Sequence, residues 1–134
     1  MAVLYDPDCG FCRVCVAVLL SWDGAGRLRP VPLFGSEAAG LLAGMPEADQ
    51  AASWHAVDGG GVVRSGGAAF GPVLDALPRG RRLAALGRRF PGALDGGYRW
   101  VADHRTLMGR FVPHAARRWA DDVLRVSGHE ASGR

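Results

Sequence analysis

Three residue types are absent from this 134-residue sequence, which contains no lysine, no isoleucine and no asparagine. All sixteen basic residues are therefore arginines, which we interpret as a bias toward GC-rich codons and not as chemistry. The longest uncharged apolar run near the start, Val14 to Trp22, is far too short to span a bilayer. No signal peptide is visible after Met1. We therefore expect a cytoplasmic protein without a membrane span.

Cysteine is scarce, with only three residues. A chain of this length can bury a single core without disulfide bridges. In a reducing compartment such cysteines are more often catalytic, metal-binding or inert than structural. Glycine and proline together stay below the share that signals disorder. The composition predicts one globular unit.

Charge is unevenly distributed. Residues 1 to 78 hold four arginines and eight acidic residues, whereas residues 79 to 134 hold twelve arginines and five acidic residues. A basic helical half could recruit an acidic partner, so one alternative is a non-catalytic binding module with a basic helical face. The arginines are scattered and do not alternate with aromatic residues, so we do not expect a nucleic-acid partner.

Two cysteines separated by two residues, Cys9 and Cys12, follow the apolar run Ala2 to Tyr5 and precede an amphipathic segment. This order predicts a strand, a turn and a helix that starts at the dithiol. Unpaired N–H groups and the helix dipole stabilise a thiolate at a helix N-terminus. The thiolate is the form that attacks a disulfide.

An apolar stripe with helical spacing supports the helix, which Asp23 and Gly24 end. The stripe consists of Phe11, Val14, Cys15, Val18, Leu19 and Trp22. We expect Cys9 to be exposed at the cap as the attacking thiol, and Cys12 to be more covered as the resolving thiol. Cys15 lies on the stripe, so we expect it to be packed in the core.

The remaining pattern predicts an α/β fold. A strand at 28–34 with two prolines is followed by a helix at 37–43 and by a helical turn or loop at 47–52. A hairpin with a glycine loop spans 53–65, and a helix covers 68–77. The order β-α-β-α-β-β-α is that of a thioredoxin or glutaredoxin-like core in residues 1–78. The dithiol falls at its first strand-to-helix turn, where such sheets usually place their chemistry.

Beyond this core the sequence predicts a helical C-terminal extension over residues 79–126, packed on the core or on a partner. Its helices are expected at 81–90, from 94 to 112, and at 115–126, with Pro113 as a break. In the second, apolar residues keep a heptad-like spacing in which Arg105 occupies one step. Residues 127–134 are expected to form a disordered tail.

The opening motif resembles that of the DCC family of predicted thiol-disulfide oxidoreductases, which have a thioredoxin-like fold. Its D-x-x-C-x-x-C signature corresponds here to Asp6, Cys9 and Cys12, preceded by Tyr5. The resemblance continues to about Phe111, through Ser53-Trp54, Asp58-Gly59, Tyr98, Trp100 and Arg105. It implies a thiol-disulfide oxidoreductase of the protein-disulfide reductase type.

For Cys9 we expect a pKa in the upper part of the range of about 3.5 to 7.5 known for activated cysteines, and a reducing pair. Asp6 and Asp8 disfavour the thiolate, and Arg13 offsets part of this effect. Asp6 is also a candidate proton acceptor for Cys12.

We expect a substrate to contact Gly10, Phe11, Ser53 and Trp54. Thioredoxins place a cis-proline before the third strand, and Ser53 takes that place here. The substrate would be a disulfide-containing protein or a low-molecular-weight thiol, with no cofactor beyond the dithiol and an external electron donor.

A metal–thiolate site, zinc or iron–sulfur, is the other alternative. Cys9, Cys12 and Cys15 form part of a ferredoxin-type run that lacks its fourth cysteine. Neither His55 nor His104 has ligand spacing, and a continuous helix would turn the three thiols in different directions.

Overall fold

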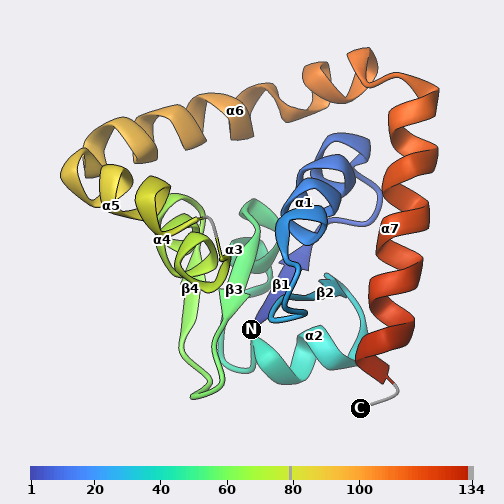
Figure 1. The fold of residues 1–134 in the computed structure, drawn as a ribbon, viewed down its shortest axis with the longest axis horizontal. Helices are drawn as coiled ribbons and strands as arrows, with labels where there is room; N and C mark the ends of the chain where they lie inside the picture. Colours follow the sequence, from blue (N-terminus) through green and yellow to red (C-terminus); the bar gives the residue numbers. More distant parts are fainter. Residues whose placement is uncertain (79, 133–134) are drawn as a thin grey trace.

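The computed structural model describes residues 1–78 and 80–132 (Figure 1). Its strands are β1 (Ala2–Tyr5), β2 (Arg29–Pro32), β3 (His55–Val57) and β4 (Val63–Ser65). The helices of the first half are α1 (Gly10–Trp22), α2 (Ser36–Leu41), α3 (Glu47–Ala52) and α4 (Gly67–Ala76). They are followed by α5 (Arg81–Arg89), α6 (Pro91–Phe111) and α7 (His114–Ser132).

The four strands form one mixed sheet in the order β2-β1-β3-β4. β1 runs parallel to β2 and antiparallel to β3, and β4 forms a hairpin with β3. This topology confirms the predicted thioredoxin-like α/β core, with α3 as a short helix where the sequence predicted a helical turn or loop. The dithiol loop, residues 6–9, leaves the carboxyl end of the central strand β1 and leads into α1, which contains Cys12.

β2 lies at the edge of the sheet and contains two prolines. The N–H groups of Arg29 and Leu33 donate to carbonyl groups at either end of β1, at 2.9 and 2.8 Å. Pro30 and Pro32 alternate with these inward-facing donors, so their nitrogens lie on the outer side of the strand. β2 therefore keeps its hydrogen bonds to β1 despite the two prolines.

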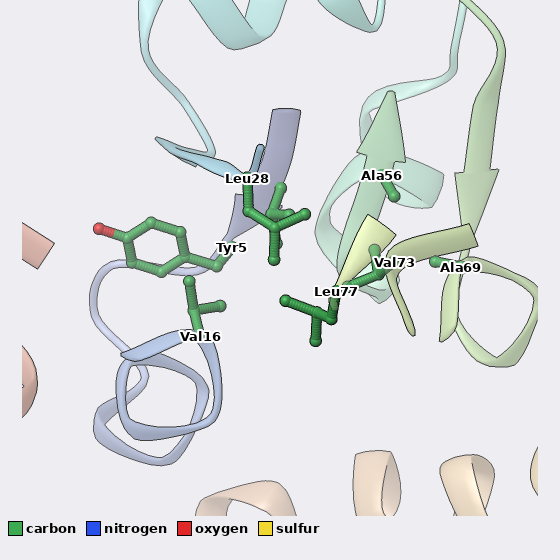
Figure 2. Close-up of a cluster of buried hydrophobic side chains, with 8 residues drawn as sticks. Tyr5, Val16, Leu28, Ala56, Ala69, Val73 and Leu77 are labelled. Atoms are coloured by element: carbon green, nitrogen blue, oxygen red, sulfur yellow. The ribbon is translucent and has the colours of Figure 1, made fainter. Parts of the chain in front are cut away.

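Side chains of β1 alternate between two hydrophobic clusters, one on each face of the sheet. The cluster under α1 and α4, shown in Figure 2, consists of Val3, Tyr5, Val16, Leu28, Ala56, Ala69, Val73 and Leu77. The cluster on the α2 side consists of Ala2, Leu4, Val31, Leu33, Ala38, Leu42 and Val57. Because both faces of β1 are buried, the dithiol loop starts from a fixed strand.

The buried face of α1 differs from the predicted stripe. Val16 and Ala17 are buried, whereas Cys15 and Trp22 are exposed. The reason is that α1 has neighbours on several sides, since it packs on the sheet, on α6 and along α7. Apolar residues therefore surround the helix, and their spacing alone does not identify the face that is buried most deeply.

Two of the three C-terminal helices, α6 and α7, enclose the dithiol end of the core, whereas α5 packs on α4. α6 crosses over α1 and α4, and α7 runs beside α1 and β2 (Figure 1). Arg13 of α1 forms an ion pair with Asp121 of α7, and Ala120 between the two helices is fully buried. None of the helices within residues 1–78 and 80–132 is long and apolar enough to cross a membrane.

The tail prediction is wrong for most of its length, because α7 continues to Ser132. No proline follows Pro113, so each further residue can extend the helix by one hydrogen bond. Residues 133 and 134 lie outside the described part of the chain. α6 starts at Pro91 instead of residue 94, because proline is well suited to the first helical position. The division of the chain at residue 78 stays a prediction.

Candidate active site

Cys9 is the N-cap residue of α1, as predicted. Its backbone is extended, with φ −83° and ψ 103°, and its Sγ accepts the N–H of Cys12 at 3.2 Å. Both cysteines are half-buried free thiols. The predicted exposure of Cys9 is therefore corrected: Arg105, Thr106 and Gly109 of α6 line a cavity together with it.

The two thiols differ in acidity. The pKa of Cys9 is lowered to about 6, chiefly by a hydrogen bond from the Cys12 side chain and further by the Cys12 backbone N–H, although burial opposes the shift. The same hydrogen bond raises the pKa of Cys12, and burial adds to this effect. Near neutral pH, Cys9 is therefore a thiolate and Cys12 keeps its proton.

The cation that faces the dithiol is Arg105 and not Arg13. Arg13 pairs with Asp121, whereas Arg105 lowers the pKa of both cysteines through its charge, after the larger effects described above. Asp6 acts in the opposite direction on both thiols, as predicted for Cys9. The pKa of Cys9 falls in the predicted range, but the main cause of its shift is the Cys12 side chain, which the sequence pattern did not indicate.

Asp6 lies in the loop between β1 and α1. Its Oδ1 accepts the N–H of Asp8 at 2.9 Å, and its carbonyl oxygen accepts the N–H of Cys9 at 3.4 Å. Asp6 is half-buried and borders the same cavity as Cys9. The hydrogen bond to Asp8 therefore holds the carboxylate in the loop beside the dithiol.

Two cavities adjoin the dithiol, one on each side. The apolar cavity, about 130 Å³, borders Cys12, and its walls include Phe11, Trp54, Phe70 and Tyr98. The polar cavity, about 390 Å³, borders Cys9, and its walls include Asp6, Asp8, Gly10, Arg110 and Arg117. Arg105 of α6 lines both cavities. Cys9 and Cys12 thus border cavities of different polarity.

A comparison with protein families agrees with this geometry. The family model described as DCC1-like thiol-disulfide oxidoreductase matches residues 3–111, from β1 to the end of α6. The chain belongs to this family. No curated protein and no solved structure gives a significant match. The resemblance drawn from the D-x-x-C-x-x-C motif is confirmed, and α7 lies outside the part that this DCC1-like family defines.

The later residues of the DCC resemblance have different places in the structure. Tyr98 and Arg105 line the apolar cavity. Trp100 is exposed and stacks on His104, with ring centroids 4.6 Å apart. Asp58 shapes the hairpin loop by accepting backbone N–H groups of residues 60 and 62. Of this later group, Trp54, Tyr98 and Arg105 therefore adjoin the dithiol.

Tyr98 of α6 lies against Ser53 and Trp54, the segment that we expected to contact a substrate. Burial raises the pKa of its phenol, and hydrogen bonds with the Trp54 backbone and the Ser53 side chain oppose the shift. Ser53 is extended, and no peptide bond in the described residues is cis. A Cβ atom at Gly66, where φ is +57°, would lie 2.8 Å from the Tyr98 ring. α6 thus covers Ser53 closely.

The four residues that we predicted to contact a substrate lie in different parts of the site. Phe11 and Trp54 line the apolar cavity, and the Trp54 ring meets Phe70 edge to face at 4.9 Å. Gly10 lines the polar cavity. Ser53 lies against Tyr98 and lines neither cavity. Contact between these residues and a substrate stays a prediction.

Cys15 is exposed, which corrects its predicted place in the core. It borders the apolar cavity, and packing on that side raises the pKa of its thiol to about 11. Within the described residues, no group of three His, Cys, Asp or Glu side chains is placed to hold a metal. The ring nitrogens of buried His55 are hydrogen-bonded to Ser65 and Gln50. These findings give the metal–thiolate alternative no support.

Proposed function

We propose that this chain reduces disulfides by dithiol exchange, with Cys9 as the attacking thiol and Cys12 as the resolving thiol. The observations that carry the proposal are the N-cap position of Cys9, where its sulfur accepts the Cys12 backbone N–H at 3.2 Å, and the effect of the Cys12 side chain, which lowers the Cys9 pKa. These contacts stabilise the nucleophilic thiolate and hold the second thiol within reach of it.

In the first step, the Cys9 thiolate attacks one sulfur of the substrate disulfide. A Cys9–substrate disulfide forms, and the other half of the substrate leaves as a thiolate. The hydrogen bond that kept Cys12 protonated is weakened, because Cys9 has lost its negative charge. The pKa of Cys12 therefore falls once the mixed disulfide exists.

In the second step, Cys12 loses its proton and attacks the Cys9 sulfur. The Cys9–Cys12 disulfide forms, and the second half of the substrate leaves as a thiolate, which can then take up the proton that Cys12 released. Asp6 is our candidate acceptor for the Cys12 proton, because its charge already acts on this thiol. The cycle needs no cofactor beyond the dithiol, but an external dithiol must supply two electrons to restore the reduced pair.

Mapping of alkylated cysteines tests this proposal directly. The purified protein is reduced, mildly oxidised, alkylated and analysed by mass spectrometry. We expect a reversible Cys9–Cys12 disulfide. Cys15 should remain a thiol in both states and should react slowly, because its pKa is about 11. Three thiols that react freely and never pair would overturn the proposal.

Replacing Asp6 with asparagine tests its role in the second step. We expect resolution by Cys12 to slow by about tenfold or more, the usual range for loss of a proton acceptor, and attack by Cys9 to change less than about twofold. The asparagine side chain can still accept the Asp8 N–H, so the loop is preserved. Rapid acid quenching and mass spectrometry measure the lifetime of the mixed disulfide.

The matched control is Asp49→Asn, a carboxylate that is exposed on α3 and lines neither cavity. It should leave both steps nearly unchanged. If Asp6→Asn slows attack and resolution equally, Asp6 is not the proton acceptor.

A further inference from the structure

The polar cavity beside Cys9 is lined by charged side chains of both signs. α6 contributes Arg105 and Arg110, and α7 contributes Arg117. The loop before α1 contributes Asp6 and Asp8. Within residues 1–78 and 80–132, none of these three arginines forms an ion pair with a carboxylate. Three cationic groups are therefore available to a ligand that enters from the side of Cys9.

Arg117 is held in place beside the dithiol loop. One of its terminal nitrogens donates to the carbonyl oxygen of Gly109, and its Nε lies against Gly10, only 3.4 Å from where a Cβ would be. This Nε is buried and has no hydrogen-bond acceptor in the part of the chain that the structure describes. A buried donor without a partner is unfavourable, so Arg117 holds this position at some cost in stability.

Access to Cys9 favours a small molecule. α6 passes over the dithiol, and Tyr98 is hydrogen-bonded to the Ser53–Trp54 segment where an extended peptide would dock. The polar cavity, at about 390 Å³, has a volume typical of sites for small ligands. Entry through this cavity brings a ligand to Cys9 without displacing α6.

We propose that the substrate is a low-molecular-weight, amino-acid-derived disulfide whose carboxylates bind Arg105, Arg110 and Arg117 and whose ammonium group faces Asp6 and Asp8. This inference rests on the proposed function and names its substrate class. Guanidinium groups bind carboxylates through charge-assisted, often paired hydrogen bonds. The bound disulfide loses one thiolate when Cys9 attacks it and the second thiolate when Cys12 resolves it, while the Cys9–Cys12 pair is oxidised.

The test compares three disulfides as oxidants of the reduced full-length protein. Glutathione disulfide carries carboxylates and ammonium groups, hydroxyethyl disulfide is neutral, and cystamine carries only positive charge. We expect glutathione disulfide to react fastest. Arg110→Gln and Arg117→Gln should each slow its reaction about tenfold and should change the reaction of hydroxyethyl disulfide by less than about twofold.

Arg82→Gln is the matched control, because Arg82 is exposed on α5 and lies outside the polar cavity. Thermal unfolding shows whether Arg117→Gln has weakened the packing of α7. If it has, Arg110→Gln still tests the inference, because this variant removes no hydrogen bond to α7. Equal slowing of all three disulfides, or faster reduction of a protein disulfide such as insulin, would overturn the inference and leave the proposed function intact. Failure to react with any disulfide would overturn the proposed function itself.

Discussion

A Cys9→Ser variant is expected to lose the reduction of hydroxyethyl disulfide by a factor on the order of a thousand or more, because a hydroxyl is not ionised at neutral pH and is a far weaker nucleophile than a thiolate. In the wild type, the Cys9 pKa of about 6 makes this sulfur the one thiolate of the pair. Loss of the disulfide is followed by chromatography under single-turnover conditions.

The matching Cys12→Ser variant should fail at a later step. Cys9 still attacks, but no second thiol resolves the product, so a Cys9–substrate disulfide accumulates and is detected as a mass increase of the intact protein. Cys15→Ser is the control for the chemical change itself, and it should retain nearly full activity. An adduct on Cys12 that forms at the wild-type rate in Cys9→Ser would show that the roles are reversed.

The reaction of Cys9 with iodoacetamide is expected to rise with pH around a midpoint near 6. The sign follows from the lowered pKa: the thiolate is present above this midpoint and is lost as the pH falls through it. Cys12→Ala removes the thiol hydrogen bond that contributes most to the shift, so the midpoint should move up toward 9.0, the ordinary value. Alkylation rates of Cys9, measured by mass spectrometry from pH 4 to pH 10, give both midpoints.

The alkylation rates of Cys9 in the wild type and in Cys12→Ala should also cross as the pH rises. A thiol of higher pKa is intrinsically more nucleophilic, with a Brønsted slope of about 0.4 to 0.5. Cys12→Ala should therefore react more slowly than wild type below about pH 7 and faster above about pH 9. Cys15→Ala is the matched control and should leave the Cys9 midpoint near 6. An unchanged midpoint in Cys12→Ala would assign the shift to the helix N-terminus and to Arg105.

Local patterns predicted much of the core. The apolar run before Asp6 becomes β1, and Cys9 caps α1 where the dithiol spacing placed it. The hairpin around Gly59 to Gly61 follows from its turn residues. These features depend on neighbours in sequence, which is why periodicity and turn chemistry are sufficient to find them.

Contacts distant in sequence were not predictable in the same way. The sequence marked Arg105 in one way, because it takes an apolar position in the spacing of α6. That spacing does not reveal which element the helix will cross. No pattern marked Arg110 and Arg117, because their common feature is the cavity that α6 and α7 form with the dithiol loop. Cys15 was wrongly predicted to lie in the core for a related reason. α1 packs against other elements on several sides, and the helical spacing of its apolar residues does not show which side is buried.

The two prolines of β2 have a consequence for contacts between molecules. Sheet edges with free N–H and C=O groups can pair with a strand of another chain, which leads to aggregation. At Pro30 and Pro32 the outer edge offers carbonyl groups but no N–H donor. A foreign strand would leave its own carbonyl groups unpaired there. The two prolines thus disfavour the addition of a foreign strand at this edge of the sheet, and β2 still keeps its hydrogen bonds to β1.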